Sequence, residues 1–112
     1  MRQVYQLEWA SKDLGQESRV ALGDVNGDGF INIIAGTTAS SGQQSNLHVF
    51  RYRGETYHEL GRTSLGKNDT HWIGCHDLDK DGVDEIIVGC TSGIYIYKMR
   101  GGQLEIGRAS CR

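Results

Sequence analysis

The 112-residue chain contains no proline, and its positive and negative charges almost balance. A formal net charge of −2 is far from the basic character that nucleic-acid binding requires, so no nucleic-acid partner is expected. No apolar run approaches the roughly 20 residues of a membrane-spanning helix, so no span is expected either. Three cysteines are too few for a small fold built on disulfides. The length fits one small domain or a piece of one.

Glycine, by contrast, is abundant, and its 16 copies predict many tight turns and little room for long helices. The chain is also an internal repeat. Residues 24–36 and 77–89 align without a gap at an offset of 53 and share the pattern D-x-[DN]-x-D-G-x-x-[NE]-I-I-x-G. Farther along, residues 47–54 match residues 94–101 at an offset of 47. The question therefore becomes which repeat array the chain belongs to.

Each repeat predicts four short strands that are rich in Ile, Val and Tyr and separated by glycine-containing turns. A sustained 3.6-residue apolar pattern, which would predict helix, is missing. The expected strands are 19–22, 31–35, 46–52 and 56–60, then 71–75, 85–88, 94–99 and 103 onward. Four antiparallel strands at a period near 50 residues are typical of a β-propeller blade. The expected fold class is therefore all-β, with four-stranded antiparallel blades.

Two acidic loops, each between the first two strands of a repeat, carry the main chemical signal. The side chains at positions 1, 3, 5 and 9 of each loop bear oxygen: Asp24, Asn26, Asp28 and Asn32, then Asp77, Asp79, Asp81 and Glu85. A glycine at position 6 permits a sharp turn, after which the position-7 carbonyl of Phe30 or Val83 can face the same centre. All-oxygen ligation favours Ca²⁺, and zinc is disfavoured because no Cys or His sits at ligand spacing within the loop. The sequence predicts two calcium sites, with tighter binding at the second because it has four carboxylates against two.

Two alternatives explain the same loops. Asp, Asn and Gly are ordinary turn residues, so each loop could be a solvated acidic turn, although the repetition of the spacing weakens that interpretation. An EF-hand or a dockerin-like loop would need an acid at position 12 and flanking helices. Position 12 is Ala35 in one loop and Val88 in the other, and both loops lead into strand-like sequence.

The loop pattern resembles the calcium loop of FG-GAP/VCBS repeats, which build integrin α-subunit propellers and occur in many bacterial surface proteins. The resemblance implies that the loop joins the first two strands of a blade. It also implies two calcium sites, in which the Phe30 and Val83 carbonyls join the acidic and amide side chains. Position 9, most often Asp in the family, is Asn32 or Glu85, and Cys75-His76 precedes the second loop where glycine is usual. Because the FG and GAP tripeptides are missing, integrin-like ligand recognition is not implied.

Two blades cannot close a propeller, which needs about four to eight. The chain is therefore expected to be a fragment whose partners are the remaining blades of a longer protein. Its expected parts are the last strand of a preceding blade, a first repeat, a truncated second repeat and a non-native tail that resembles a translated sequencing adapter, at residues 1–15, 16–66, 67–105 and 106–112.

The expected function is a non-catalytic, calcium-binding propeller segment of a secreted or cell-surface protein, serving as a scaffold for protein or glycan binding. No nucleophile–base set, phosphate-binding loop or dinucleotide motif points to an enzyme. The alternative is the propeller of a carbohydrate-active enzyme, of lyase or hydrolase type, whose catalytic residues lie elsewhere. Cys75 and Cys90 are expected to be free thiols, because their positions in the predicted hairpin are not opposed.

Overall fold

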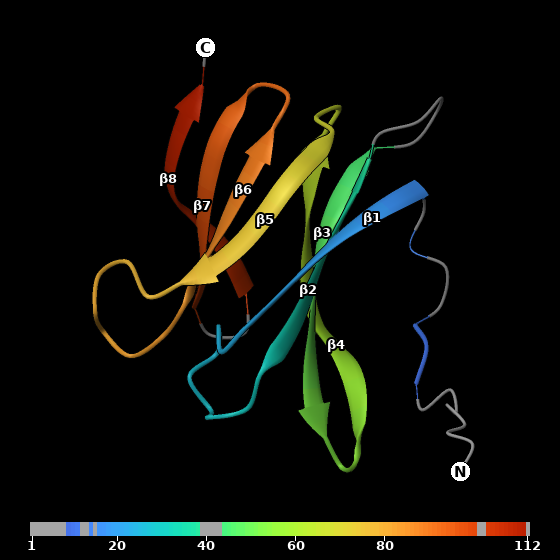
Figure 1. The fold of residues 1–112 in the computed structure, drawn as a ribbon, viewed down its shortest axis with the longest axis vertical. Coiled ribbons are helices and arrows are strands. Elements are labelled where there is room, and N and C mark those ends of the chain that lie inside the picture. The colour runs from blue at the N-terminus through green and yellow to red at the C-terminus, as the bar shows by residue number, and fades with distance from the viewer. Residues whose placement is uncertain (1–8, 12–13, 15, 39–43, 101–102, 112) are drawn as a thin grey trace, which may run out of the picture.

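The computed structural model describes residues 9–11, 14, 16–38, 44–100 and 103–111, with 16–17 and 103–111 described by their backbone alone. Its strands form two four-stranded antiparallel sheets, each in the order of the chain (Figure 1). The first sheet contains β1 (Gln16–Gly23), β2 (Asn32–Thr38), β3 (Ser45–Arg53) and β4 (Thr56–Gly66). The second contains β5 (Thr70–His76), β6 (Glu85–Cys90), β7 (Gly93–Arg100) and β8 (Gln103–Cys111). The described residues include no helix, so the all-β prediction is confirmed.

The two repeats fold with the same strand register around the acidic loops. In the first sheet Leu22 pairs with Ile33, and in the second Cys75 pairs with Ile86, its counterpart at the offset of 53. Position 9 of each loop is the first residue of the strand that follows, namely β2 or β6. The loops therefore close equivalent hairpins, as the repeat predicted.

The sheets pack against each other through β1 and β2 of the first sheet and β5 of the second. Two glycines make this close approach possible. A Cβ added at Gly23 would lie 2.4 Å from the Cβ of Cys75, and one added at Gly36 would lie 2.8 Å from the Cγ2 of Thr70. A side chain at either position would force the sheets apart, because real Cβ atoms do not approach so closely.

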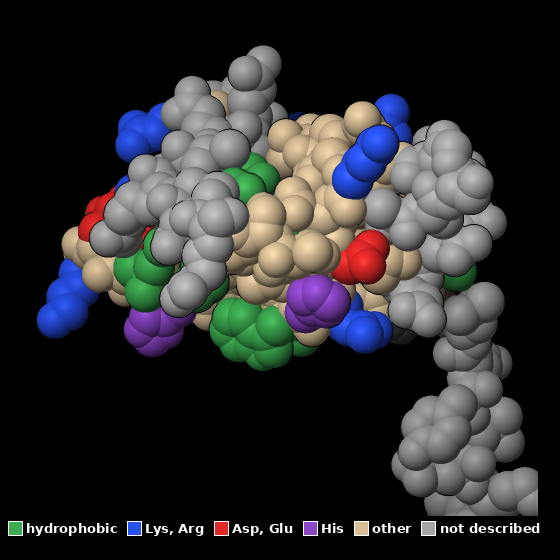
Figure 2. Space-filling model, turned by 90° about the horizontal axis from the view of Figure 1, so that it is seen from above, with side chains coloured by type: hydrophobic (Ala, Val, Ile, Leu, Met, Phe, Trp, Pro, Cys, Tyr) green, Lys and Arg blue, Asp and Glu red, His purple; other side chains and the backbone are tan. Residues whose placement is uncertain are grey.

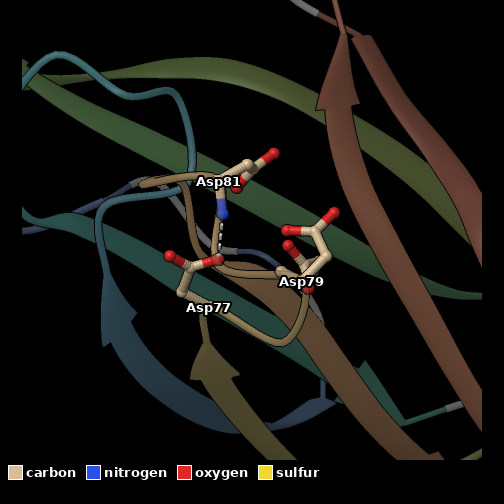
Figure 3. A group of neighbouring side chains, drawn as sticks. Asp77, Asp79 and Asp81 are labelled. Atoms are coloured by element: carbon tan, nitrogen blue, oxygen red, sulfur yellow. Dashed lines mark hydrogen bonds between the residues drawn. The ribbon is translucent and has the colours of Figure 1, made fainter.

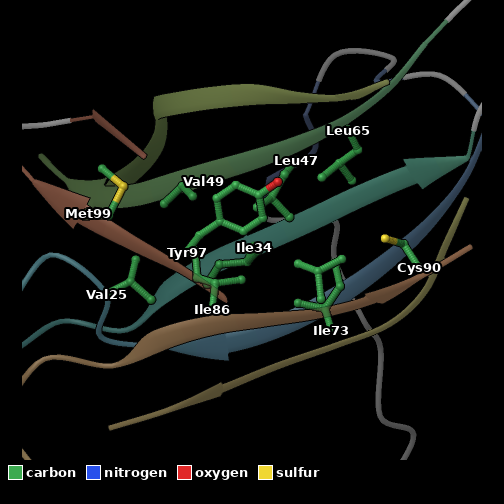
Figure 4. Close-up of a cluster of buried hydrophobic side chains, with 11 residues drawn as sticks. Val25, Ile34, Leu47, Val49, Leu65, Ile73, Ile86, Cys90, Tyr97 and Met99 are labelled. Atoms are coloured by element: carbon green, nitrogen blue, oxygen red, sulfur yellow. The ribbon is translucent and has the colours of Figure 1, made fainter. Parts of the chain in front are cut away.

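The core lies between the sheets, and both contribute fully buried side chains to it (Figure 4). Ile34, Leu47 and Val49 come from the first sheet, and Ile86 and Val88 come from the second; all five are 0% exposed. Burial of each such side chain contributes about 1.5–3 kcal/mol. The two repeats thus share one core, which is built from side chains of both sheets.

The opposite face of each sheet leaves apolar side chains in solvent. Val20 and Leu22 on β1 are about 60% exposed, and Trp72 on β5 and Ile94 on β7 are more than half exposed. Lys and Arg side chains visible from above lie apart from one another, without a common basic patch on the described part of that face (Figure 2). The surface thus has apolar patches on its flanks and no concentrated positive charge in this view.

The predicted boundaries fall partly on residues that the structure does not describe. Most of the predicted strand within residues 1–15 lies outside the described residues, and the described residues 9–11 and 14 carry no strand. β8 continues through 106–111, the stretch predicted as a non-native tail. The division of the chain into parts therefore stays a prediction. Cys75 and Cys90 are free, as expected.

Candidate metal centre

Position 1 of each acidic loop has the same structural task. Both carboxylate oxygens of Asp24 accept backbone N–H bonds, from Gly27 at 2.9 Å and Gly29 at 3.0 Å. Asp77 likewise accepts bonds from the N–H groups of Asp81 at 3.1 Å and Gly82 at 2.8 Å. These bonds fold each loop around the first carboxylate and are the reason why an Asp begins both motifs.

The position-6 glycines have the left-handed backbone that the motif predicted, with φ of 86° at Gly29 and 89° at Gly82. Side chains rarely tolerate this conformation, whereas glycine adopts it at little cost. At position 5, Asp28 and Asp81 accept a bond from the N–H two residues on, at 2.9 Å from Phe30 and 3.0 Å from Val83. The N–H groups of Phe30 and Val83 thereby hold these residues in place at position 7, and ligation by their carbonyls stays a prediction.

The second loop gathers four carboxylates around one point. One oxygen from each of Asp77, Asp79, Asp81 and Glu85 lies within 4.8 Å of the others. Figure 3 shows the three aspartates projecting from the same tight turn, with the bond from the Asp81 N–H to Asp77 drawn as a dashed line. Like charges at this spacing repel one another unless a cation lies among them. The cluster could therefore hold a metal ion.

Glu85 differs from the three aspartates because it is buried. It is only 3% exposed, and its Oε2 accepts a 2.9 Å bond from the Leu78 N–H. Its Oε1 is buried without a hydrogen-bond partner among the described residues. Burial is the main reason that the pKa of Glu85 is raised, with the Asp79 charge adding to it. An orphaned carboxylate oxygen beside three carboxylates is the environment that a bound cation would satisfy.

Asn32 occupies the same loop position in the first repeat but has no free group. Its Oδ1 accepts a 2.9 Å bond from the Val25 N–H, and its Nδ2 donates a 3.1 Å bond to the Phe50 carbonyl. Nearby, the Nδ2 of Asn26 donates to Asp28 at 3.2 Å. The amides of the first loop are thus neutral and already hydrogen-bonded, so this loop does not depend on a cation to the same degree.

Lys98 on β7 already places a positive charge at the second loop. Its Nζ lies 2.9 Å from Asp79 Oδ2, donates a bond to Asp81 and lies 4.0 Å from the orphaned Oε1 of Glu85. The bond from Lys98 is the main reason that the pKa of Asp81 falls to about 2, and the two aspartates in turn raise the pKa of Lys98. The lysine is a single charge against four carboxylates, so the cluster remains negative.

Asp84, at position 8 of the second loop, connects that loop to the first. Its backbone N–H donates a 2.9 Å bond to the Asp24 carbonyl, and its Oδ2 accepts a 3.1 Å bond from the Asp24 N–H. A single residue thereby satisfies both backbone groups of the residue that opens the other loop. The counterpart of Asp84 in the first loop is Ile31, which cannot accept such a bond.

Two residues of this site were not predicted from the sequence. The aligned repeats place Arg51 and Lys98 at equivalent positions, and this recurring cation was the signal that could have identified Lys98. No such signal existed for Asp84, because the two repeats differ at position 8. Of the ten residues predicted as ligands, four come together as carboxylates. For the other six, ligation stays a prediction.

A scan against protein-family models matches residues 24–88 to the FG-GAP-like repeat. The match begins at the first residue of the first loop, ends within β6 and covers more than half of the chain. The chain belongs to the FG-GAP-like repeat family. No curated protein and no solved structure matches it.

The FG-GAP-like match takes in both acidic loops and the strands between them, the part of the chain in which the hydrogen bonds above occur. In this chain the two loops share the family spacing and bury the residue at position 9, but they differ in charge and in the residue at position 8. Within the described residues, there is no helix with the length and apolar character that a membrane crossing needs.

Proposed function

We propose that this chain is a calcium-binding segment of a β-propeller and that it acts as a non-catalytic scaffold in a secreted or cell-surface protein. The observation that carries the calcium assignment is the buried Oε1 of Glu85, which accepts no hydrogen bond from a described residue and lies beside Asp77, Asp79 and Asp81. Carboxylate oxygens in a flexible loop match the ligands that Ca²⁺ prefers. Largely exposed loop sites of this kind fill where calcium is abundant, as it is outside the cell.

Two calcium sites are part of the proposal, one in each loop. The second would use the four clustered carboxylates and the Val83 carbonyl. The first would use Asp24, Asn26, Asp28, the Phe30 carbonyl and Asn32, with fewer negative charges and amides that are already hydrogen-bonded. We therefore propose the second loop as the tighter site.

The arrangement of the repeats supports further blades as partners. Leu47 and Val49 on β3 pack into the core against the second sheet. Their repeat counterparts on β7, Ile94 and Ile96, lie on the face of the second sheet opposite Tyr97, because side chains alternate along a strand. The second sheet thus presents the same kind of apolar face that the first sheet buries. A protein or glycan ligand would then bind to the assembled propeller.

Thermal unfolding in metal-depleted buffer tests the calcium assignment. Calcium at about 100 times its dissociation constant should stabilise the fold by about 2.7 kcal/mol, which raises the melting temperature by several degrees. Magnesium at the same concentration should raise it less, because Mg²⁺ demands a stricter octahedral geometry. An Asp79→Asn/Asp81→Asn double variant should lose most of the calcium response.

Glu55→Gln serves as the matched control, because it removes a charge from the exposed turn between β3 and β4. This variant should keep the full calcium response. A melting temperature that calcium leaves unchanged in the parent chain would refute the calcium assignment. An equal response in the double variant would move the site away from the second loop.

A further inference from the structure

A cavity of about 240 Å³ lies between the two repeats, next to both acidic loops. Its polar lining consists of Asn26, Arg51 and Lys98, and its apolar lining includes Val25, Val83 and Met99. Side chains from both repeats line it. The cavity is smaller than a typical drug-binding pocket and has the size for one side chain or a small organic molecule.

Arg51 is the unusual residue of this lining. Its side chain makes no hydrogen bond and no ion pair to any described residue, and its Nε is buried without a partner. A guanidinium is always charged and carries five N–H donors, so leaving it unpaired beside a cavity is unfavourable. The cavity therefore offers a positive charge to which no described residue presents an acceptor, with a buried Nε that has no hydrogen-bond partner among those residues.

The repeat explains why no described residue pairs with this arginine. Lys98 holds the equivalent position in the second repeat, and there the acids at positions 3 and 5 of the loop, Asp79 and Asp81, bind it. In the first repeat position 3 is Asn26, which is neutral and bonds instead to Asp28 at 3.2 Å. The same strand position thus carries a cation in both repeats, but only the second loop neutralises it.

We propose that this cavity binds a carboxylate on a short aliphatic stem, with the carboxylate paired to Arg51. A planar guanidinium matches a carboxylate through two parallel hydrogen bonds. The apolar wall formed by Val83 and Met99 favours a ligand that carries methylene groups over a bare inorganic anion. An acidic side chain of a peptide and a free small carboxylic acid share this chemistry. The inference does not require bound calcium.

Titration of the ¹⁵N-labelled chain, followed through its Arg Nε–Hε signals, tests the site directly. The probes are butyrate with butyramide as its neutral match, and N-acetyl-glutamate amide with N-acetyl-glutamine amide as its neutral match. Calcium is removed beforehand with a chelating resin, because a soluble chelator is itself a carboxylate. Butyrate should shift one arginine signal saturably, and this signal should be missing in Arg51→Gln.

Two variants of Arg51 then distinguish the contribution of its charge from that of its planar guanidinium group. Arg51→Gln should weaken carboxylate binding by at least about tenfold, while Arg51→Lys should retain part of it because the charge remains. Arg53→Gln is the matched control on the same strand, since Arg53 is exposed and does not line the cavity. Circular dichroism of each variant checks that the β-structure is kept.

The outcomes decide between sources of the carboxylate. Tighter binding of the glutamate amide than of butyrate would point to a peptide side chain, and the reverse would point to a free acid. Equal binding of the acids and their amides would overturn the proposal, and so would inorganic phosphate binding as tightly as butyrate. Carboxylate binding that survives Arg51→Gln would overturn it as well, because the charge would then come from another residue.

Discussion

The two acidic loops share one sequence pattern and similar backbone geometry, yet they differ in how much negative charge their side chains carry. In the loop at 24–32 the neutral amides of Asn26 and Asn32 form hydrogen bonds within the protein and bring no charge. In the loop at 77–85 carboxylates occupy these positions, and they require a cation from elsewhere. Lys98 provides part of that charge. The comparison teaches that the motif fixes the fold of the loop, whereas the choice between amide and carboxylate decides how strongly it needs a metal.

Substitutions at position 8 should give the largest difference between the two loops, measured as a change in the free energy of unfolding. Asp84→Ala removes the acceptor of the 3.1 Å bond from the Asp24 N–H and leaves that group unsatisfied between the repeats. We expect the free energy of unfolding to fall by about 1–3 kcal/mol, measured by urea denaturation. Ile31→Ala, at the same position of the first loop, is the matched control and should change it far less, because Ile31 is half exposed. Equal losses would mean that Asp84 does not connect the loops energetically.

Position 3 compares the calcium affinity of the loops. Asp79→Ala removes one of four carboxylates from its loop, whereas Asn26→Ala removes a neutral amide from the other. We expect Asp79→Ala to weaken calcium binding at its own site by about tenfold or more and Asn26→Ala to have a smaller effect at the first site. Calorimetric titration of the two variants measures both. Tighter binding at the first loop would show that geometry outweighs charge count.

Position 9 tests whether the buried carboxylate is retained for a metal. Glu85→Gln keeps an oxygen for the Leu78 N–H but removes a buried charge, which makes the second loop resemble the first with Asn32. Without metal, this variant should be more stable than the parent at neutral pH by about 1 kcal/mol, since a buried charge whose Oε1 accepts no hydrogen bond from a described residue is costly. Its calcium affinity should nevertheless fall.

The pH dependence of that difference has a defined sign. The folded-state pKa of Glu85 is raised by burial, so ionised Glu85 destabilises the metal-free fold above that pKa. As the pH falls through this raised pKa toward the unfolded value of about 4.3, the parent binds a proton and the penalty disappears. The stability difference between Glu85→Gln and the parent should therefore shrink on acidification. A difference that stays constant between pH 7 and pH 4 would contradict the assignment of the cost to Glu85.

Substitution of Lys98 should change the calcium affinity of the second loop by the smallest amount among these variants. Lys98→Gln removes a cation that competes with a metal for Asp79 and Asp81, so calcium should bind the second loop a few-fold more tightly. Lys80→Gln changes the charge of the same loop by the same amount at an exposed position without a bond to the cluster. If both variants increased the affinity equally, the effect would arise from net charge and not from competition at the site.

Much of this structure could be predicted from the repeat. The strand positions, the place of both loops and the left-handed glycines follow from local pattern, because alternation and turn geometry depend on neighbouring residues. The buried state of Glu85 could not be predicted, since nothing in the loop indicates whether position 9 faces water or the interior. The role of Asp84 was equally hidden, because its bonds reach a residue 60 positions away.

The sequence by itself determined the two hairpins and the oxygen-rich turns that close them, since those bonds form between residues a few positions apart. Only the tertiary structure decided which carboxylates come together with Lys98 and which oxygen of Glu85 accepts no hydrogen bond from the described residues. It also decided that Arg51 lines the cavity without a pairing partner among those residues. The physical reason is that these features depend on how the sheets pack. Gly23 and Gly36 allow β5 to lie close to β1 and β2, and that approach brings one loop onto the backbone of the other.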